Sequence, residues 1–334
     1  MQRLIFWGVL LLIVIIIGLI IDQLYYRIIR LFLEKHTAQV IRLYTFLVVL
    51  VLLIGGYLMG HYVTRLQVNV TQATITSAKV PASFSGYRIA QISDFHIGSF
   101  TDERGRKFVP ELVDAILAEK PDMIVFTGDL VSMRSAEAVP FRQELARLAS
   151  AGIPVFSIMG NHDYADYMRA FDDQRRKLDV DSLMTLQTQA GWQMLNNRTV
   201  VLHRGNDSIA LVGVENIGEP PFSVYGNLSA AMQPIGGLSG ADQLFTVLLS
   251  HNPTHWRSEV LPDTDIDLTL SGNTHDLQFR LLGWSPSGMK YDEHSGLYQE
   301  GHQYLYVNTG VGCVGPALRV GVKPEVTILT LQKQ

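Results

Sequence analysis

The chain of 334 residues has a single cysteine, Cys313, and few charged residues. One cysteine cannot form an intrachain disulfide, and it excludes a zinc site built from several cysteine ligands. Charged residues make up 17% of the chain, below the roughly 25% of an average protein. The net charge of −4 and the isoelectric point near 6.2 offer no basic surface of the kind that binds nucleic acid. We therefore expect no nucleic-acid partner.

What the chain has instead is apolar sequence, gathered at its beginning. Hydrophobic residues make up 47% of the chain, and the mean hydropathy is +0.16. Leu4–Ile21 and Leu43–Gly60 contain no charged residue, and each approaches the roughly 20 residues that a helix needs to cross a bilayer. A cleaved signal peptide is the alternative for the first run, but its apolar stretch is longer than the roughly 7–15 residues typical of one. We predict two transmembrane helices, over about 4–21 and 43–60, within a membrane anchor of residues 1–62.

The segment between the two runs, Asp22–Arg42, is more basic than their outer flanks, which carry Arg3 and Arg65. Short cytoplasmic loops of membrane proteins carry an excess of lysine and arginine. This asymmetry predicts a multi-pass protein of the cell (inner) membrane, with residues 63–334 on the extracytoplasmic side. The basic residues of the segment are Arg27, Arg30, Lys35 and Arg42.

Residues 63–334 alternate between short apolar runs and amphipathic stretches. The stretches Lys107–Glu119 and Ala138–Ala151 have helical periodicity. This order predicts a layered α/β domain. The runs that predict buried strands are Tyr87–Ile92, Met123–Phe126, Val155–Ile158, Ile209–Val214, Phe245–Leu249, Ile266–Leu270, Tyr304–Val307 and Val326–Leu331.

Polar blocks follow five of these strands, at the strand ends where α/β sheets collect ligands. Any one block could be a turn or a helix cap, but turn formation does not explain histidines in four of them. Carboxylate, amide and imidazole donors in this mixture suit divalent Mn, Fe, Zn or Mg. The blocks are Asp94-Phe95-His96, Gly128-Asp129, Gly160-Asn161-His162-Asp163, Ser250-His251-Asn252-Pro253 and Gly272-Asn273-Thr274-His275.

In this ordered set the chain resembles the calcineurin-like metallophosphoesterases from about Tyr87 to its end, and most of all the membrane-associated bacterial members of the YkuE-like type. The resemblance implies a four-layer αββα sandwich with two divalent metal ions. It implies that Asp94, His96 and His275 hold the first ion, that Asp129 bridges both, and that Asn161 and His251 hold the second. His162 would contact the phosphate and assist the leaving oxygen, or alternatively be only structural.

The sequence departs from the family pattern at two positions. Asn273 stands where the family has a histidine ligand of the second metal, and an amide is a poorer donor than imidazole to zinc or iron. We therefore expect a weaker second site, or a preference for Mn and Mg. Ser132 stands where many relatives have an aspartate that orients the catalytic histidine, and Asp163 is the residue that could replace it.

The resemblance implies a membrane-anchored, metal-dependent phosphoesterase that hydrolyses a phosphate ester or a pyrophosphate bond. Its substrate would be a phosphorylated small molecule or a lipid-linked phosphate. The alternative is a catalytically weak phosphoesterase-like domain, over residues 63–334, that binds a phosphorylated ligand or a membrane partner. Asn273 is the residue that favours this alternative.

Overall fold

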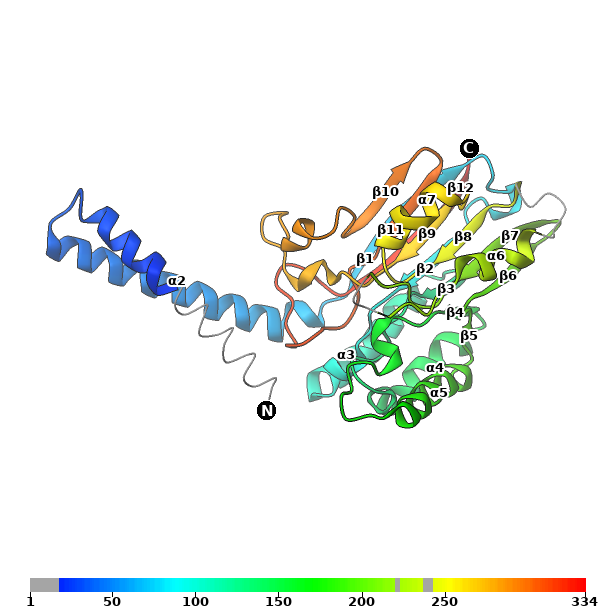
Figure 1. Ribbon diagram of the computed structural model, residues 1–334, viewed down its shortest axis with the longest axis horizontal. Coiled ribbons are helices and arrows are strands. Elements are labelled where there is room, and N and C mark those ends of the chain that lie inside the picture. Colours follow the sequence, from blue (N-terminus) through cyan, green and yellow to red (C-terminus); the bar gives the residue numbers. More distant parts are fainter. Residues whose placement is uncertain (1–17, 220–222, 237–242) are drawn as a thin grey trace. The chain divides into compact units, whose positions relative to one another are not determined.

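The computed structural model describes residues 18–219, 223–236 and 243–334, which form two compact units that meet between Leu58 and Met59 (Figure 1). The first predicted transmembrane run, residues 4–21, lies outside the described residues except for 18–21, which are helical. The second predicted run lies inside helix α2 (Lys35–Tyr62).

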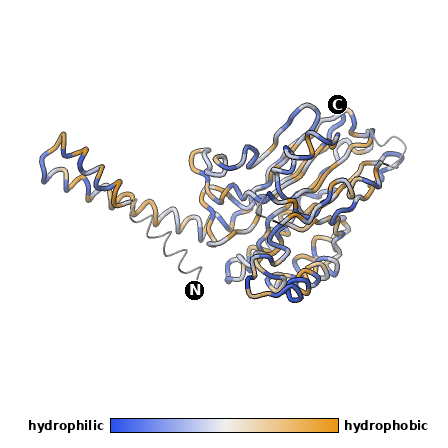
Figure 2. The backbone as a smooth tube through the Cα atoms, in the orientation of Figure 1, coloured by the Kyte–Doolittle hydropathy of each residue, from blue (hydrophilic) through white to orange (hydrophobic). Residues whose placement is uncertain are grey.

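Helix α2 is, among the described residues, the one helix long and apolar enough to cross a membrane. The most apolar 18 residues of this helical stretch have a mean hydropathy of 2.2, and only 6% of them are buried by other described parts of the chain. Figure 2 shows hydrophobic residues distributed along this helix. An apolar helix without a protein environment favours lipid as its surroundings.

The larger unit, residues 59–334, contains two six-stranded mixed sheets. The first sheet has the order β1-β12-β2-β3-β4-β5, with β2, β3 and β4 parallel, and the second has the order β10-β11-β9-β8-β7-β6, with β7, β8 and β9 parallel. The strands of the first sheet are β1 (Asn69–Ser77), β2 (Arg88–Ile92), β3 (Met123–Phe126), β4 (Val155–Ser157), β5 (Gln193–Met194) and β12 (Glu325–Lys333). Those of the second are β6 (Arg198–Arg204), β7 (Asp207–Gly213), β8 (Thr246–Leu249), β9 (Leu268–Ser271), β10 (Gly296–Glu300) and β11 (Gln303–Val307).

Three apolar clusters hold the sheets and helices together in four layers. Helices α3 (Glu103–Ala118), α4 (Arg142–Ser150) and α5 (Asp173–Gln189) pack on the outer face of the first sheet. The second cluster fills the space between the two sheets, where alternate residues of both sheets interdigitate. The third joins the second sheet to α6 (Leu228–Gly236) and to the helical turns over 256–263. This helix–sheet–sheet–helix order agrees with the layered α/β domain that the residue pattern predicts and with the four-layer sandwich that the family resemblance implies.

All eight predicted strands and both predicted helices are present, with ends shifted by a few residues. The sequence prediction missed β1, β5, β6, β10, α5 and α6. Strand β10 is mostly exposed at the edge of its sheet, so it lacks the apolar run of a buried strand. Helix α5 buries only Leu183, Leu186 and Gln187 among its 17 residues, so its sequence has little amphipathic pattern.

Candidate metal centre

All five polar blocks lie at the carboxyl ends of strands, where the parallel strands of the two sheets end side by side. Asp94 follows β2, Asp129 follows β3, and Asn161 follows β4 in the first sheet, whereas His251 follows β8 and His275 follows β9 in the second. The carboxyl ends of parallel strands form the edge where α/β sheets bind ligands. The fold therefore brings Asp94 and His275, which are far apart in the sequence, into one site.

The backbone of the site is held in an uncommon conformation. A positive φ is rare for residues other than glycine, and clusters of such residues occur at functional sites, where the surrounding structure enforces them. A positive φ turns the backbone sharply after the strand and directs the side chain into the site. The site residues with positive φ are Asp94, His96, Asp129, Asn273 and His275.

Two glycines let neighbouring blocks approach each other closely. A Cβ atom on Gly160 would lie 2.2 Å from Asp129 Oδ1, and one on Gly272 would lie 2.1 Å from Asp94 Oδ2. Both distances are far below any real carbon–oxygen contact. A side chain at either position would push a carboxylate out of the site, so the two Gly-Asn blocks require glycine for steric reasons.

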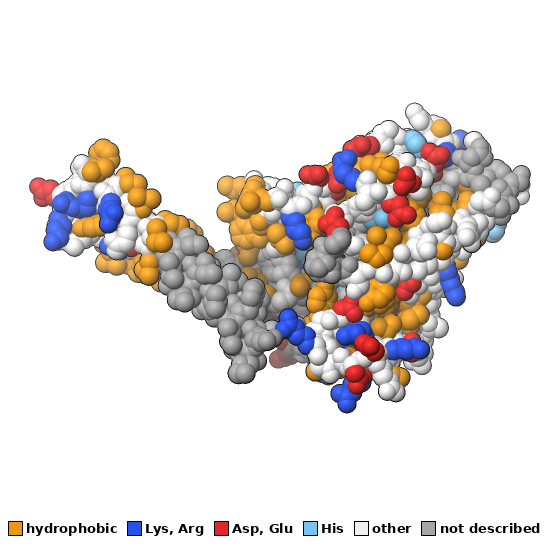
Figure 3. All heavy atoms as spheres, in the orientation of Figure 1, with side chains coloured by type: hydrophobic (Ala, Val, Ile, Leu, Met, Phe, Trp, Pro, Cys, Tyr) orange, Lys and Arg blue, Asp and Glu red, His pale blue; other side chains and the backbone are white. Residues whose placement is uncertain are grey.

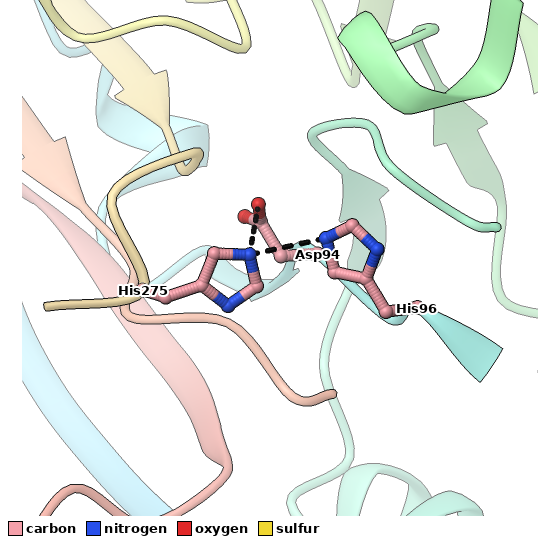
Figure 4. Close-up of side chains that lie close together, drawn as sticks. All are labelled: Asp94, His96 and His275. Carbon is pink, nitrogen blue, oxygen red and sulfur yellow. Dashed lines mark hydrogen bonds and ion pairs between the residues drawn. The ribbon is translucent and has the colours of Figure 1, made fainter. Parts of the chain in front are cut away.

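Asp94, His96 and His275 form the first group of potential ligands (Figure 4). His275 Nε2 lies 3.2 Å from Asp94 Oδ1 and 3.1 Å from His96 Nε2. The backbone N–H of Asn273 donates to both oxygens of Asp94, at 3.1 and 2.9 Å, and so fixes the carboxylate. All three side chains are buried. One carboxylate and two imidazoles facing one point are a donor set that suits a divalent cation.

Asp129, Asn161 and His251 form the second group. His251 Nε2 lies 3.2 Å from Asp129 Oδ2 and 3.1 Å from Asn161 Oδ1. His251 Nδ1 lies 2.7 Å from the carbonyl oxygen of Thr127, so this nitrogen carries the proton and donates. Asn161 Nδ2 donates to the hydroxyl of Tyr167 at 2.8 Å, which turns Asn161 Oδ1 toward His251. Such outer contacts orient metal ligands.

Asp129 Oδ2 lies between the two groups. It is buried and meets no hydrogen-bond donor in good geometry among the described residues. His96 Nε2 and His251 Nε2 nevertheless lie 3.5 and 3.2 Å from it, one from each group. A buried carboxylate oxygen without a donor is costly. Cations beside it would satisfy it, so the residues present fit the binding of divalent metal ions at this site.

The electrostatics of the site match this interpretation. Burial keeps the pKa of His96 well below its usual value, so this imidazole is neutral and free to bind a cation. Burial acts in the same direction on His251, but the carboxylate of Asp129 outweighs it and raises the pKa of His251 to about 10. The negative charge that holds this proton would equally attract a metal ion, which must displace the proton to bind.

His162 lies beside both groups, with its ring fixed from several sides. Its Nδ1 lies 2.7 Å from the carbonyl oxygen of Ser132, so Nδ1 donates, and Nε2 has no hydrogen-bond partner among the residues that the structure describes. The ring meets that of His96 edge to face, with centroids 4.8 Å apart, and stacks on Tyr167 at 4.3 Å. The acceptor that orients His162 is thus the backbone of Ser132, at the position where the family resemblance implies an aspartate.

Asp163 does not replace that aspartate. Its carboxylate accepts hydrogen bonds from the backbone N–H groups of Asp129, Val131 and Gly160, at 2.8, 3.2 and 3.0 Å. Burial, together with the nearby charge of Asp129, raises the pKa of Asp163 to about 7. Asp163 therefore ties the block after β3 to the block after β4, and its side chain acts on backbone rather than on His162.

Asn273 borders the site, and its side chain makes no hydrogen bond within the described part of the chain. It lines a pocket of about 290 Å³ together with Asp129, His162 and His275. It also lines a smaller pocket of about 80 Å³ that contains Asn161 and Tyr167. Asn273 therefore borders space beside residues of both ligand groups.

Two further residues of the site carry no sequence signal. Tyr167 lies six positions after Asn161 in an ordinary loop. Arg319 is fully buried, with Nη2 3.3 Å from His275 Nδ1 and 2.6 Å from the carbonyl oxygen of Gly312. Neither belongs to a polar block, and only the folded chain brings them to the ligands.

Comparison with known proteins places both ligand groups and His162 inside one family match. The model of the family described as calcineurin-like phosphoesterase matches residues 87–277, which include every residue of the two ligand groups and His162.

Three relatives illustrate the range of similar proteins. The Bacillus subtilis metallophosphoesterase YkuE is 31% identical over 293 residues, covering 83% of this chain and 90% of its own. A Danio rerio transmembrane protein with metallophosphoesterase domain is 27% identical over 79% of this chain, which spans only 57% of that relative. The Chlamydia trachomatis UDP-2,3-diacylglucosamine pyrophosphatase LpxG is 25% identical, over 75% of this chain and 86% of its own.

Proposed function

Because the chain belongs to the calcineurin-like phosphoesterase family, whose members are metal-dependent phosphoester hydrolases, we propose that it is a membrane-anchored enzyme that cleaves a phosphate ester or a pyrophosphate bond at a dinuclear metal centre. In this proposal Asp94, His96 and His275 hold one ion. Asp129 bridges to a second ion, held by Asn161 and His251, with Asn273 beside it.

The observation that carries the proposal is the position of Asp129 Oδ2. It is buried without a hydrogen bond of good geometry among the described residues, and it has one imidazole nitrogen from each ligand group within 3.5 Å. Bound divalent ions would supply neutralisation of the phosphate oxygens and a water of lowered pKa as nucleophile.

The protein's own residues would arrange the substrate around these charges. Because Nδ1 of His162 donates to Ser132, Nε2 is the atom left to face the substrate. In its protonated form it would donate to a phosphate oxygen or to the leaving oxygen, and so stabilise the charge that develops there. Its stacking on Tyr167 and contact with His96 hold the ring in position for this role.

The apolar helix and the relatives support the substrate class of this proposal. An apolar helix near the N-terminus indicates association with a membrane, and the Danio rerio relative is named as a transmembrane protein. LpxG, named as a pyrophosphatase of UDP-2,3-diacylglucosamine, supports a lipid-linked phosphate as substrate. A phosphorylated small molecule is the other substrate class in this proposal.

The proposed placement is in the cell (inner) membrane with two spans, residues about 4–21 and 43–60, and with the catalytic unit on the extracytoplasmic side. It rests on the basic residues between the two apolar runs. A reporter that works only outside the cytoplasm, fused after Gln334, should be active in cells. A fusion active only in the cytoplasm would reverse the orientation, without affecting the proposed chemistry.

The catalytic proposal is tested with the full-length protein in detergent, stripped of metal and then supplied with Mn, Zn, Fe or Mg. We expect metal-dependent hydrolysis of an aryl phosphodiester, together with about two bound ions per chain. Asp129→Asn should lose both, whereas Asp265→Asn, at an exposed position away from the site, should keep both. Two bound ions with no turnover of mono-, di- or pyrophosphate substrates would favour the alternative, a weak phosphoesterase-like domain that binds a phosphorylated ligand.

A further inference from the structure

The loop that follows His275, together with Val314, exposes a group of large apolar side chains next to the metal centre. Leu282 is completely exposed and Met289 is 82% exposed. Figure 3 shows apolar side chains gathered where the loops between β9 and β10 lie in Figure 1. Soluble proteins seldom gather exposed apolar residues in one place without a partner. We name this group the apolar lip; its members are Leu277, Leu281, Leu282, Trp284, Met289 and Val314.

Backbone pairing ties the apolar lip to residues 317–320. The N–H of Arg280 donates to the carbonyl oxygen of Val320, and the N–H of Val320 donates to that of Gln278, both at 2.8 Å. Gln278 also holds the lip residue Val314, because the N–H of Val314 donates to Gln278 Oε1 at 2.6 Å. The lip thus has a fixed position on the larger unit.

The same residues 317–320 hold the last turn of α2, which belongs to the larger unit. His61 Nδ1 lies 2.7 Å from the carbonyl oxygen of Ala317, and the N–H of Arg319 donates to the carbonyl oxygen of Gly60 at 3.4 Å. A Cβ atom on Gly60 would lie 2.6 Å from Leu318 Cδ1, so the helix end is closely packed there. The lip and the end of α2 are therefore held by one short segment.

The apolar run Leu43–Gly60 ends at this point of contact. If α2 crosses the bilayer, the chain leaves the hydrocarbon within a few residues of Gly60, because the run is only slightly shorter than the roughly 20 residues that a span needs. Tyr62 follows the apolar run by two residues, and Trp284 belongs to the lip. Tyrosine and tryptophan favour the interface between lipid and water. A protein partner would not require the lip to share its support with the end of a membrane helix.

We propose that the apolar lip docks on the surface of the lipid bilayer and holds the mouth of the metal centre at the level of the lipid headgroups. The inference rests on the proposed membrane anchoring through α2. Leu277 and Val314 line the same pocket as His162 and His275, so the lip continues into the metal centre. A phosphate group carried by a membrane amphiphile would then reach the ligands while its apolar part stays in lipid.

The test places an environment-sensitive nitrobenzoxadiazole label on the full-length protein in nanodiscs of phosphatidylcholine and phosphatidylglycerol. Leu282→Cys carries the label at the tip of the lip. Leu178→Cys, at an exposed leucine of α5, is the matched control. Cys313 is buried, so the unsubstituted protein gives the background labelling. We expect a blue-shifted emission at position 282, quenching by lipids that carry a doxyl group, and several-fold slower reduction by dithionite than at position 178.

Equal dithionite reduction at both positions would overturn the docking proposal. Slow reduction without quenching by doxyl lipid would also overturn it, because a protein partner or a second copy would then cover the lip. Hydrolysis of the soluble aryl phosphodiester is measured on the same labelled samples. If the label at position 282 lies in water and the protein hydrolyses the aryl phosphodiester, only the lip proposal is wrong. If the label lies in lipid and the protein is inactive, only the catalytic proposal is wrong.

A second measurement uses the double variant Leu282→Asp and Met289→Asp, neither of which lines the pocket. We expect unchanged turnover of the soluble aryl phosphodiester and reduced turnover of a phosphate ester embedded in the nanodisc. Equal turnover of the embedded ester by the variant and the unsubstituted protein would contradict the proposal.

Discussion

The Nε2 atoms of His96 and His275 lie 3.1 Å apart, although each ring already has a partner for its other nitrogen. His96 Nδ1 lies 3.2 Å from Ser132 Oγ, and His275 Nδ1 lies 3.3 Å from Arg319 Nη2. Since Asp94 Oδ1 is also 3.2 Å from His275 Nε2, three donor atoms face one point from different strands. The three donor atoms are thus close enough together to share one cation.

Removal of one of these donors should therefore empty the first metal position. We expect His275→Ala to weaken metal binding and hydrolysis by at least ~100-fold, because loss of even an outer-shell partner typically costs about 10–100-fold. The bound metal is measured by elemental analysis after dialysis. His302→Ala, at an exposed histidine outside the site, is the control and should match the unsubstituted protein. Full metal content in His275→Ala would remove this residue from the ligand set.

The raised pKa of Asp163 predicts that the thermal stability of the metal-free protein depends on pH. Its pKa is about 7 in the fold, against a usual value of 3.8. A carboxyl group with a raised pKa stabilises the fold fully below its unfolded pKa, and this contribution is lost as the pH rises through about 7. Asp163→Asn cannot ionise, so the stability advantage of the unsubstituted protein over this variant should shrink between pH 5 and pH 8.

The measurement is the thermal unfolding midpoint in detergent with excess chelator, because bound cations would lower the pKa of a nearby carboxyl. An advantage that grows with pH would contradict the raised pKa. Asp163→Ala leaves three backbone N–H groups without their acceptor, and it should lower the free energy of unfolding by about 3 kcal/mol or more.

Tyr167 is expected to affect metal binding at the second position, although it is not a proposed ligand. Its hydroxyl accepts the hydrogen bond from Asn161 Nδ2 and so keeps Asn161 Oδ1 toward His251. Tyr167→Phe retains the ring stacked on His162 but frees the amide, so we expect about 10–100-fold weaker binding of the second ion and little change at the first. Titration with Mn separates the two steps. Tyr291→Phe, in the same small pocket, is the control, and an equal loss in both variants would speak against orientation of Asn161.

The central strands and the five polar blocks could be predicted because both leave local patterns in the sequence. Strands such as β3 and β8 are buried on both faces, which gives continuous apolar runs. The blocks directly follow the strands, and their order along the chain resembles that of one family. No local pattern gives the distance between Asp94 and His275, because these residues follow strands of different sheets.

Other parts of the site left no such pattern. Arg319 reaches His275 across 44 positions of the chain, and Tyr167 acts through one hydroxyl. The sequence suggested Asp163 as the partner of His162, but a carboxylate near a turn can equally accept backbone N–H groups, and here it does. The backbone carbonyl of Ser132 orients His162, and a backbone atom is present at every position, so its role cannot be inferred from residue type.

Asn273 gives the sharpest test of how the second metal position works. The amide faces the pockets between the two ligand groups, where the family pattern has a histidine. If Asn273 contributes an oxygen to the second ion, affinity should follow the donor strength of the side chain. We expect Asn273→His to bind zinc or iron more tightly, by ~10-fold or more, because imidazole is the better donor to these metals. Asn273→Ala should bind the second ion more weakly than the unsubstituted protein. Calorimetric titration of the metal-free variants measures this order. Equal affinities of the alanine variant and the unsubstituted protein would show that Asn273 is no ligand, and that the second ion depends on Asp129, Asn161 and His251 alone.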